Sequence, residues 1–442
     1  MQGDEGDGRR VSSAAKGAWI ALSVLIVFYI VAAIDRGVIS LLVGPIKGDL
    51  GLSDFEMSLV LGLAFGFFYA VCGIPFGWLI DNFSRRAVLF CGVIFWSLAT
   101  LGTSLVQTYP QLLIARMALG MGEAALNPAA HSILADKFSR ERMATALSVY
   151  SMGAAIGGGL ALALGGWVIT YFSQFETVHF VVLGELKPWQ AVFACVGLPG
   201  LLLAFLAFTF KESAPRAAAA DGPRVRVPMW PFLKRRRALL LCFAASFGCV
   251  SMIIWSVNAW FPAFMDRNYG WSPAEIGSSF GFVSMISTLL GGLCAGLVVD
   301  RLVARGYDDA HLRVLMLTLA FGVPLGVAGF LADNPYVALV MIFLLKLLVF
   351  SCFGYGAAAM QIITPQALRG RMAALYLLGM VLLGNGLGPF TVALLTEHVF
   401  RNPMRLGDSL ATLATVVAPI AIFAAWKGMA LMRAAVLEVE DA

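Results

Sequence analysis

Twelve long apolar segments follow one another along the chain, and they constrain the fold more than any other feature. A helix needs roughly 20 apolar residues to cross the hydrocarbon core of a bilayer. Of the 442 residues, 60% are hydrophobic and 13% charged, whereas soluble domains carry about 25% charged residues. We therefore predict an all-α membrane protein with twelve transmembrane helices. The predicted spans are 18–45, 55–80, 86–107, 110–135, 141–171, 189–210, 238–266, 273–299, 312–332, 335–363, 371–398 and 408–432.

The longest charged interruption, KESAPRAAAADGPRVRVPMWPFLKRRR, divides these spans into six plus six. Short motifs recur at equivalent places in both halves. RERMATAL follows the fourth span and RGRMAALY the tenth, while GWLIDNFSRR follows the second and GLVVDRLVAR the eighth. Such a duplication is typical of transporters whose two bundles rock about a central site. The predicted domains are a tail (1–17), a six-helix bundle (18–210), a linker (211–237), a second, pseudo-symmetric six-helix bundle (238–433) and a tail (434–442).

Lysine and arginine predict the orientation. With the N-terminus in the cytoplasm, the tails and the loops on that side carry 23 basic residues, against five on the other side. The positive-inside rule therefore predicts cytoplasmic termini and a cytoplasmic linker. This bias also explains the net charge of +5 without any nucleic-acid partner.

The loop motifs resemble those of the major facilitator superfamily over essentially the whole chain after residue 17. The superfamily signature between the second and third spans is matched apart from Asn82 and Ser84. A glycine there would allow close helix approach, and charged pairs would latch the cytoplasmic side; the alternative is that the arginines only set topology. The candidate gate residues are Gly77, Asp81, Arg85, Arg86, Asp136, Arg140, Arg142 and, from the repeat, Asp300.

Four charged residues lie deep inside predicted spans of the first half, away from the span ends. Asp35 and Arg36 are adjacent in the first span, and Arg116 and Glu123, seven residues apart, share one face of the fourth. At ~1.5 Å per residue, the adjacent pair falls at a depth between the other two. We expect Arg36 or Arg116 to face Glu123, with Asp35 nearby. Because intramembrane charges are costly, we interpret the cluster as functional rather than as a structural salt-bridge cluster.

A carboxyl group within a membrane protein can bind a proton when it is desolvated and release it when an arginine approaches. Asp35 and Glu123 are therefore the candidate proton carriers. Arg36 and Arg116 would compete for their charge or bind an anionic headgroup.

The Asp35-Arg36 pair, the Arg116-x6-Glu123 spacing and the stretch GEAALNPAAHSILADKFSRERMATALSVYSMGAAIG (122–157) resemble the spinster family. That resemblance implies a proton-coupled secondary transporter of lysophospholipids or sphingosine-phosphate-like lipids that works by alternating access. Similar acidic positions occur in organic-anion symporters, so a proton-coupled carrier of small organic anions or drugs is the alternative. Gly158 stands where the antiporter-associated motif has proline, which leaves the coupling direction open.

The second half carries one charge of this kind, Lys346, opposite Met117 in the repeat. One charged side and one mainly apolar side would suit a headgroup and an acyl chain. Lys346 is a candidate headgroup ligand or member of the charge network; local pairing is the alternative. Residues that would line the cavity are Asn127, Trp255, Asn258, Trp260, Tyr355 and Met360.

No pattern predicts an enzyme: nucleotide loops, HExxH and Ser/His/Asp arrangements are missing from the sequence. The seven cysteines fall inside spans without metal-ligand spacing, so no metal, and no cofactor apart from the coupling proton, is expected. We expect a monomer in a bacterial inner membrane, with an amphipathic lipid substrate and membrane lipids as its partners.

Overall fold

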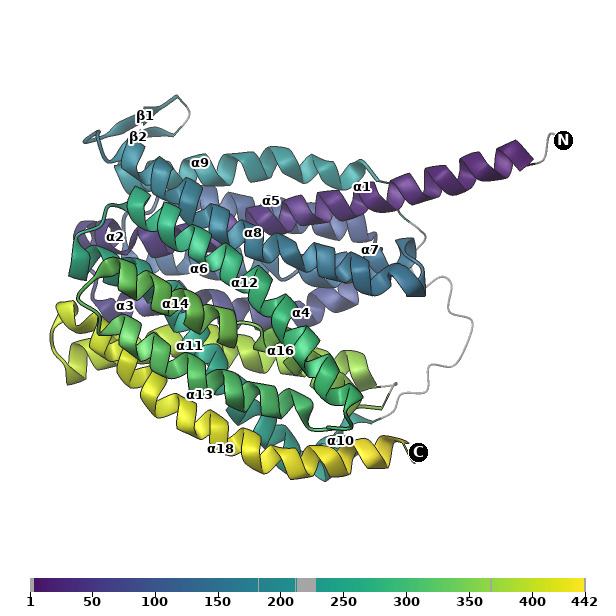
Figure 1. Ribbon diagram of the computed structural model, residues 1–442. Helices are drawn as coiled ribbons and strands as arrows, with labels where there is room; N and C mark the ends of the chain where they lie inside the picture. The colour runs from purple at the N-terminus through teal and green to yellow at the C-terminus, as the bar shows by residue number, and fades with distance from the viewer. Residues whose placement is uncertain (1–3, 182, 211, 213–227, 366–367, 441–442) are drawn as a thin grey trace.

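The computed structural model describes residues 4–181, 183–210, 212, 228–365 and 368–440. Helices lie side by side along one direction, and both termini lie at the same end of the bundle (Figure 1). We call this the terminus end. The opposite end carries α2 and a two-stranded antiparallel hairpin in which Val178 pairs with Leu186, and we call it the hairpin end. Apart from this hairpin, the described elements of the bundle are helices.

The N-terminal half contains all the helices before the linker. Its elements are α1 (Asp4–Gly37), η1 (Val38–Leu41), α2 (Val43–Leu50), α3 (Asp54–Ser58), the π-helical turn η2 (Leu59–Leu63), α4 (Ala64–Asn82), α5 (Arg85–Thr103), α6 (Tyr109–Glu123), α7 (Leu126–Lys137), α8 (Arg140–Phe172), β1 (Val178–Phe180), β2 (Gly184–Leu186), α9 (Pro188–Leu203) and η3 (Ala204–Phe208).

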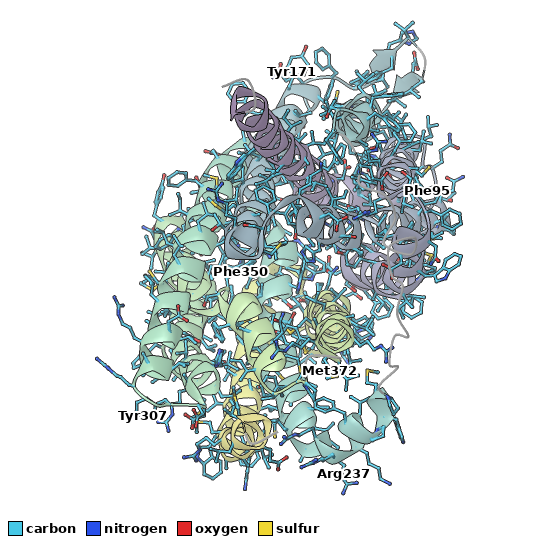
Figure 2. All side chains as sticks on the ribbon, turned by 90° about the vertical axis from the view of Figure 1, so that its right-hand side faces the viewer. Phe95, Tyr171, Arg237, Tyr307, Phe350 and Met372 are labelled. Carbon is cyan, nitrogen blue, oxygen red and sulfur yellow. The ribbon has the colours of Figure 1, made fainter. Side chains whose placement is uncertain are left out.

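The chain after the gap in the described residues begins with a short linker helix, α10, and continues into the C-terminal half. Its elements are α10 (Met229–Arg235), α11 (Arg237–Tyr269), α12 (Pro273–Ala304), α13 (Ala310–Phe330), α14 (Pro335–Val349), α15 (Cys352–Ile362), α16 (Arg369–Met380), the π-helical turn η6 (Val381–Leu387), α17 (Gly388–Leu394), the π-helical turn η7 (Leu395–Val399), η8 (Pro403–Arg405) and α18 (Leu406–Glu440). Seen from the terminus end, the two halves form an upper and a lower group of helices (Figure 2).

The prediction of an all-helical membrane fold is confirmed. Within the described residues, eleven helices are long and apolar enough to cross a membrane. The fourth predicted span is not one of these eleven; it carries Arg116 and Glu123 and is divided into α6 and α7. Pro128 explains the division, since it has no N–H to continue the helical hydrogen bonds. The tenth span is divided similarly, into α14 and α15.

Helix boundaries follow local chemistry. Ser53 and Glu56 form a capping box that starts α3, and Ser272 and Glu275 do the same for α12. Most of the predicted tail is helical, because α1 begins at Asp4. Most of the predicted linker lies outside the described residues, but its last part forms α10.

The two halves pack closely through small residues in α8 and α12. A Cβ atom added at Gly277 would lie 2.2 Å from the carbonyl oxygen of Leu162, and one at Gly166 would lie 2.2 Å from that of Pro273. Only glycine permits such backbone approach. This contact holds the two halves together in the conformation seen here.

Candidate functional site

The charged cluster of the N-terminal half contains one ion pair. Arg36 Nε lies 3.1 Å from Glu123 Oε2, and the side chains of Arg36 and Glu123 are 22% and 2% exposed. Glu123 is the last residue of α6, so the break before α7 sets its position. The expected pairing of Glu123 with Arg36 or Arg116 is therefore observed, with Arg36 as the partner.

Asp35 and Arg116 lie beside this pair but are held differently. Asp35 is completely buried, and neither of its carboxylate oxygens makes a hydrogen bond of good geometry among the described residues, with the side chains of Thr100 and Trp96 as its polar neighbours. Arg116, 3% exposed, donates to two backbone carbonyls, from Nε to Val60 O (3.3 Å) and from Nη1 to Asp35 O (3.4 Å). The four charges meet as expected, but Arg116 binds backbone and leaves the Asp35 carboxyl unpartnered.

One aromatic ring lies close to both guanidinium groups. The Cζ atoms of Arg36 and Arg116 lie 5.6 and 5.9 Å from the ring centroid of Phe65 on α4. Both distances are in the range of cation–π attraction. Phe65 therefore helps to hold both cations at this depth, a role that the sequence did not indicate.

A network of tyrosines and one asparagine continues from Arg36 towards the terminus end. Asn127 Nδ2 donates to Tyr69 Oη, and Tyr150 Oη donates to Asn127 Oδ1, both at 2.8 Å. Tyr29 stacks on Tyr150 with centroids 4.9 Å apart, and the three tyrosines interact electrostatically with Arg36. Asn127 was predicted to line the site, whereas the tyrosines were missed. Tyr29 lies seven residues before Arg36, and this helical spacing was the signal that could have found it.

The C-terminal half contributes Lys346, which is 4% exposed. Its Nζ donates to Asn258 Oδ1 and Ser284 Oγ, both at 2.8 Å, and lies 4.8 and 5.1 Å from the rings of Phe280 and Phe350. No acidic side chain pairs with it among the described residues. Lys346 is thus a buried cation held by neutral groups, and Asn258 is one of its ligands.

A small pocket beside Lys346 has an otherwise apolar lining. Its lining residues are Ile253, Ile254, Val257, Leu345, Lys346, Val349 and Phe350, from α11 and α14 apart from Phe350 just after α14.

The other predicted lining residues are mostly packed. Trp260 is fully buried and its indole donates to Pro389 O (3.0 Å), so it does not face open space in this conformation. Tyr355 and Met360 are 5% and 4% exposed. Trp255 is half-buried, and its indole nitrogen has no partner among the described residues.

At the terminus end, a charged network joins α5 to α7 and to the chain after η3. Arg85 Nη1 donates to Asp136 Oδ2 and to Ser132 O. Glu212 Oε1 lies 3.6 Å from Arg85 Nε, and its Oε2 lies 3.4 Å from Arg86 Nε. Three predicted gate residues thus meet here, together with Glu212, which lies in the predicted linker and was missed.

Among the described side chains, no ion pair or hydrogen bond joins Asp81, Arg142 or Asp300 to this network. Asp81, Arg142 and Asp300 are exposed, and the side chain of Arg140 lies outside the described part of the structure. A Cβ atom added at Gly77 would meet nothing within 4 Å. The expectation that Gly77 allows a close helix contact is therefore wrong in this conformation.

The described part of the chain contains no candidate metal site, because no three His, Cys, Asp or Glu residues are grouped there. The arrangement instead offers two carboxyl groups and two guanidinium groups in one half and a lone ammonium group in the other. This set can exchange protons and bind an anion.

Comparisons with known proteins agree with this architecture. The family model described as Major Facilitator Superfamily matches residues 25–389. An MFS-type efflux pump of Mycolicibacterium smegmatis is 26% identical over 95% of both chains. Protein spinster of Drosophila melanogaster is 23% identical over 90% of this chain and 66% of its own. A probable galactarate/D-glucarate transporter, GarP of Escherichia coli, is 27% identical over 81% of this chain and 83% of its own.

Among solved structures, the fold is similar to a bacterial homologue of the human lysosomal transporter Spinster, in an inward-facing and unoccupied conformation. The TM-score is 0.78 at 23% identity, over 96% of this chain and 98% of the other. This similarity supports the fold and leaves the substrate to be argued from the site.

Proposed function

Because this chain belongs to the Major Facilitator Superfamily, we propose that it is a proton-coupled transporter of lysophospholipids or sphingosine-phosphate-like lipids, working by alternating access. The family identifies it as an integral membrane protein and a secondary transporter, not an enzyme. The lipid substrate and the proton are the proposed parts.

The observation that carries the lipid proposal is the unequal distribution of charge. Asp35, Arg36, Arg116 and Glu123 belong to the N-terminal half, whereas the pocket between α11 and α14 is apolar except for Lys346. Its volume is only about 10 Å³ in this conformation, so it would have to widen to admit an acyl chain. An amphipathic molecule has the same division into a charged headgroup and an apolar chain. Burial of each CH₂ of an acyl chain would contribute about 0.8 kcal/mol.

Arg36 is suited to the headgroup. Its Nε contacts Glu123 and Ala32 O, and its side chain is 22% exposed, so its two terminal nitrogens could turn to a ligand. Such a fork can bind two oxygens of a phosphate at once. The hydroxyl groups of Tyr29, Tyr69 and Tyr150 would complete the contacts.

Proton coupling would follow from competition for Arg36. When an anionic headgroup binds Arg36, Glu123 loses its partner and a buried, unpaired carboxylate becomes costly. Uptake of a proton removes that cost. Asp35, buried without a hydrogen-bond partner, is the second candidate carrier.

A small organic anion is the second candidate substrate. The relatives include transporters named for galactarate/D-glucarate and hexuronate, and the tyrosine–asparagine network could bind the hydroxyl groups of a sugar acid. In this case the apolar pocket beside Lys346 would not contact the substrate.

The two candidates differ in their use of that pocket. Binding of lysophosphatidylglycerol and of galactarate is measured on the purified protein and on Ile254→Gln, which places an amide in the pocket. Leu241→Gln is the control, because Leu241 lies on the same helix but is 68% exposed. The lipid proposal requires that Ile254→Gln weakens lysolipid binding while Leu241→Gln does not. Tight galactarate binding unaffected by Ile254→Gln, without lysolipid binding, would replace it with the second candidate.

Proton coupling is tested separately in proteoliposomes. Uptake of the bound substrate should respond to an imposed pH gradient, and Glu123→Gln should flatten the response without loss of folded protein. An unchanged response would remove Glu123 from the coupling mechanism. We further propose a monomer in a bacterial inner membrane with both termini in the cytoplasm, based on the 23 to five distribution of basic residues.

A further inference from the structure

Arg116 lies at the junction between the charged cluster and a π-helical turn. The turn η2 spans Leu59–Leu63, and its widened hydrogen bonding runs from Ala64 N–H to Leu59 O. The Nε of Arg116 donates to Val60 O in the middle of this turn. Side chains that insert into the backbone ladder and π-helical turns are both recognised causes of local helix distortion.

The same turn makes a close contact with the other half. A Cβ atom added at Gly62 would lie 2.0 Å from the carbonyl oxygen of Asn385 and 3.2 Å from its carbonyl carbon. Asn385 is 4% exposed and belongs to η6, the π-helical turn of the C-terminal half. Two π-helical turns, one from each half, therefore touch through their backbones, only two residues from the carbonyl that Arg116 binds.

The carboxyl groups near Arg116 are competing acceptors. Asp35 on α1 and Glu123 on α6 both attract Arg116 electrostatically, and both oxygens of Asp35 and Oε1 of Glu123 lack hydrogen-bond partners among the described residues. Arg36 on α1 and the Phe65 ring on α4 complete its charged and aromatic surroundings. Arg116 thus has one arrangement on the backbone and an alternative one on a carboxylate.

We infer that Arg116 is a positioning residue that controls the contact between the two halves through the backbone of η2. While Arg116 binds Val60 O, η2 keeps its π-helical form and Gly62 lies against Asn385. When a carboxylate takes the guanidinium group, Val60 O is released, η2 returns to α-helical winding, and the contact with η6 is lost. A change in the charge of the cluster thereby causes the two halves to separate at the hairpin end.

This role differs from that of a substrate ligand or a simple counter-ion. A ligand would contact the transported molecule, and a counter-ion would require a carboxylate partner, whereas Arg116 is buried and binds two carbonyl groups. The inference concerns the equilibrium between conformations and holds for any substrate. Only its pH dependence rests on the proposed proton coupling.

The test measures the distance between the halves at the hairpin end by pulsed electron spin resonance. Spin labels are placed at Gln107 and Asp333, which are exposed and lie on different halves, after alanine replaces the seven native cysteines. Arg116→Gln and Arg116→Lys should both shift the distribution to longer distances, because neither side chain reproduces the guanidinium geometry. Gly62→Ala should shift it in the same way, since its methyl group would overlap the Asn385 carbonyl.

Matched variants separate this role from general destabilisation. Gly73→Ala, on the same span, should leave the distances unchanged because a Cβ atom there meets nothing within 4 Å. Gly66→Ala, whose Cβ would lie 3.4 Å from Asn385 Nδ2, should give a smaller shift and replaces Gly62→Ala if that variant does not fold. The double variant Gly62→Ala/Arg116→Gln should shift no further than Gly62→Ala alone, since both act on one contact.

The pH profile gives a readout that a merely structural role would not change. Raising the pH leaves Asp35 and Glu123 charged, so the long-distance population of the wild type should grow, and Arg116→Gln should lose this response. Unchanged distances in both Arg116 variants, or shifts that add in the double variant, would overturn the inference. A flat pH profile in the wild type together with the expected shifts would instead contradict the proposed proton coupling and leave the positioning role intact.

Discussion

An ion pair between the halves at the hairpin end should stabilise the conformation seen here. Asp54 at the start of α3 accepts two hydrogen bonds from Arg267 near the end of α11, at 2.8 and 2.7 Å. The side chain of Asp54 is 2% exposed and that of Arg267 14%. Lys47, in the same half as Asp54, also binds this carboxylate. Opening of the hairpin end must break the pair with Arg267 but can retain the pair with Lys47.

The structure sets the size of the effect. Hydrogen bonds to charged groups contribute about 1.5–3 kcal/mol, and a bidentate pair with this little exposure lies towards the upper part of that range. We therefore expect Arg267→Gln to destabilise the closed hairpin end by about 2–3 kcal/mol. Since about 1.4 kcal/mol corresponds to a factor of ten, the open population relative to the closed one should rise ~30- to ~150-fold. Asp54→Asn should have a larger effect, because it leaves Lys47 and Arg267 facing each other as like charges.

The label pair at Gln107 and Asp333 measures this ratio directly. Asp49→Asn is the control, because Asp49 binds Lys187 and Trp189 of its own half and its loss should leave the ratio unchanged. A rise below about three-fold in Arg267→Gln would place the pair among exposed ion pairs that contribute about 0–1 kcal/mol. That result would refute the assignment of a latch to Asp54 and Arg267.

Other predictions concern the second cation, the terminus end and the contact between the halves. Lys346→Met should weaken binding of anionic lysolipid ~10- to ~100-fold, since a charge-assisted hydrogen bond contributes about 1.5–3 kcal/mol. Binding of zwitterionic lysolipid should weaken less. Equal losses for the two lipids in binding assays would contradict recognition of the headgroup by Lys346. Glu212→Gln should speed amide hydrogen exchange at the start of α5, where Glu212 accepts from a backbone N–H, and unchanged exchange would exclude it from the network. Gly277→Ala should lower the free energy of unfolding by about 1–3 kcal/mol through overpacking and should lower the midpoint of thermal unfolding. Gly296→Ala, with open space around its Cβ, should leave the midpoint unchanged. Equal midpoints for the two variants would contradict the close contact at Gly277.

Apolar segment lengths and repeated motifs were sufficient to predict the architecture. A helix that crosses a membrane satisfies its own backbone hydrogen bonds, so length and composition identify it without knowledge of its neighbours. The breaks within spans are harder to predict. Pro128 marks the division between α6 and α7, whereas the division between α14 and α15 has no proline at the break. The π-helical turns η2 and η6 touch across the two halves, and no local pattern contains this contact.

The sequence predicted that the four charged residues lie close together, but it did not predict which cation pairs with which carboxylate. Helical spacing placed Arg116 and Glu123 on one face, and depth placed Asp35 and Arg36 at their level. Which cation faces Glu123 depends on the rotation of α1 against α6 and on the carbonyl groups that η2 offers to Arg116.

The residues that were missed or misplaced depend on tertiary contacts. Tyr69 and Tyr150 belong to different helices, and only the fold brings both to Asn127. Trp260 had the spacing of a lining residue, but its indole is satisfied by a carbonyl of the neighbouring α17. Sequence spacing alone cannot distinguish a tryptophan whose indole N–H is buried and hydrogen-bonded from a tryptophan that lines a cavity.

The second span links the sites that the predictions treat separately. Along one continuous segment, Asp54 binds Arg267 of the other half, Val60 O binds Arg116, Gly62 touches Asn385, and Tyr69 binds Asn127. Each contact lies within one or two helical turns of the next. A change in the charge cluster that moves η2 must therefore act on the contact with η6 and on the latch at the hairpin end together. If so, Arg267→Gln and Arg116→Gln should be coupled, with a combined shift that differs from the sum of the single shifts, whereas independent latches would give shifts that add.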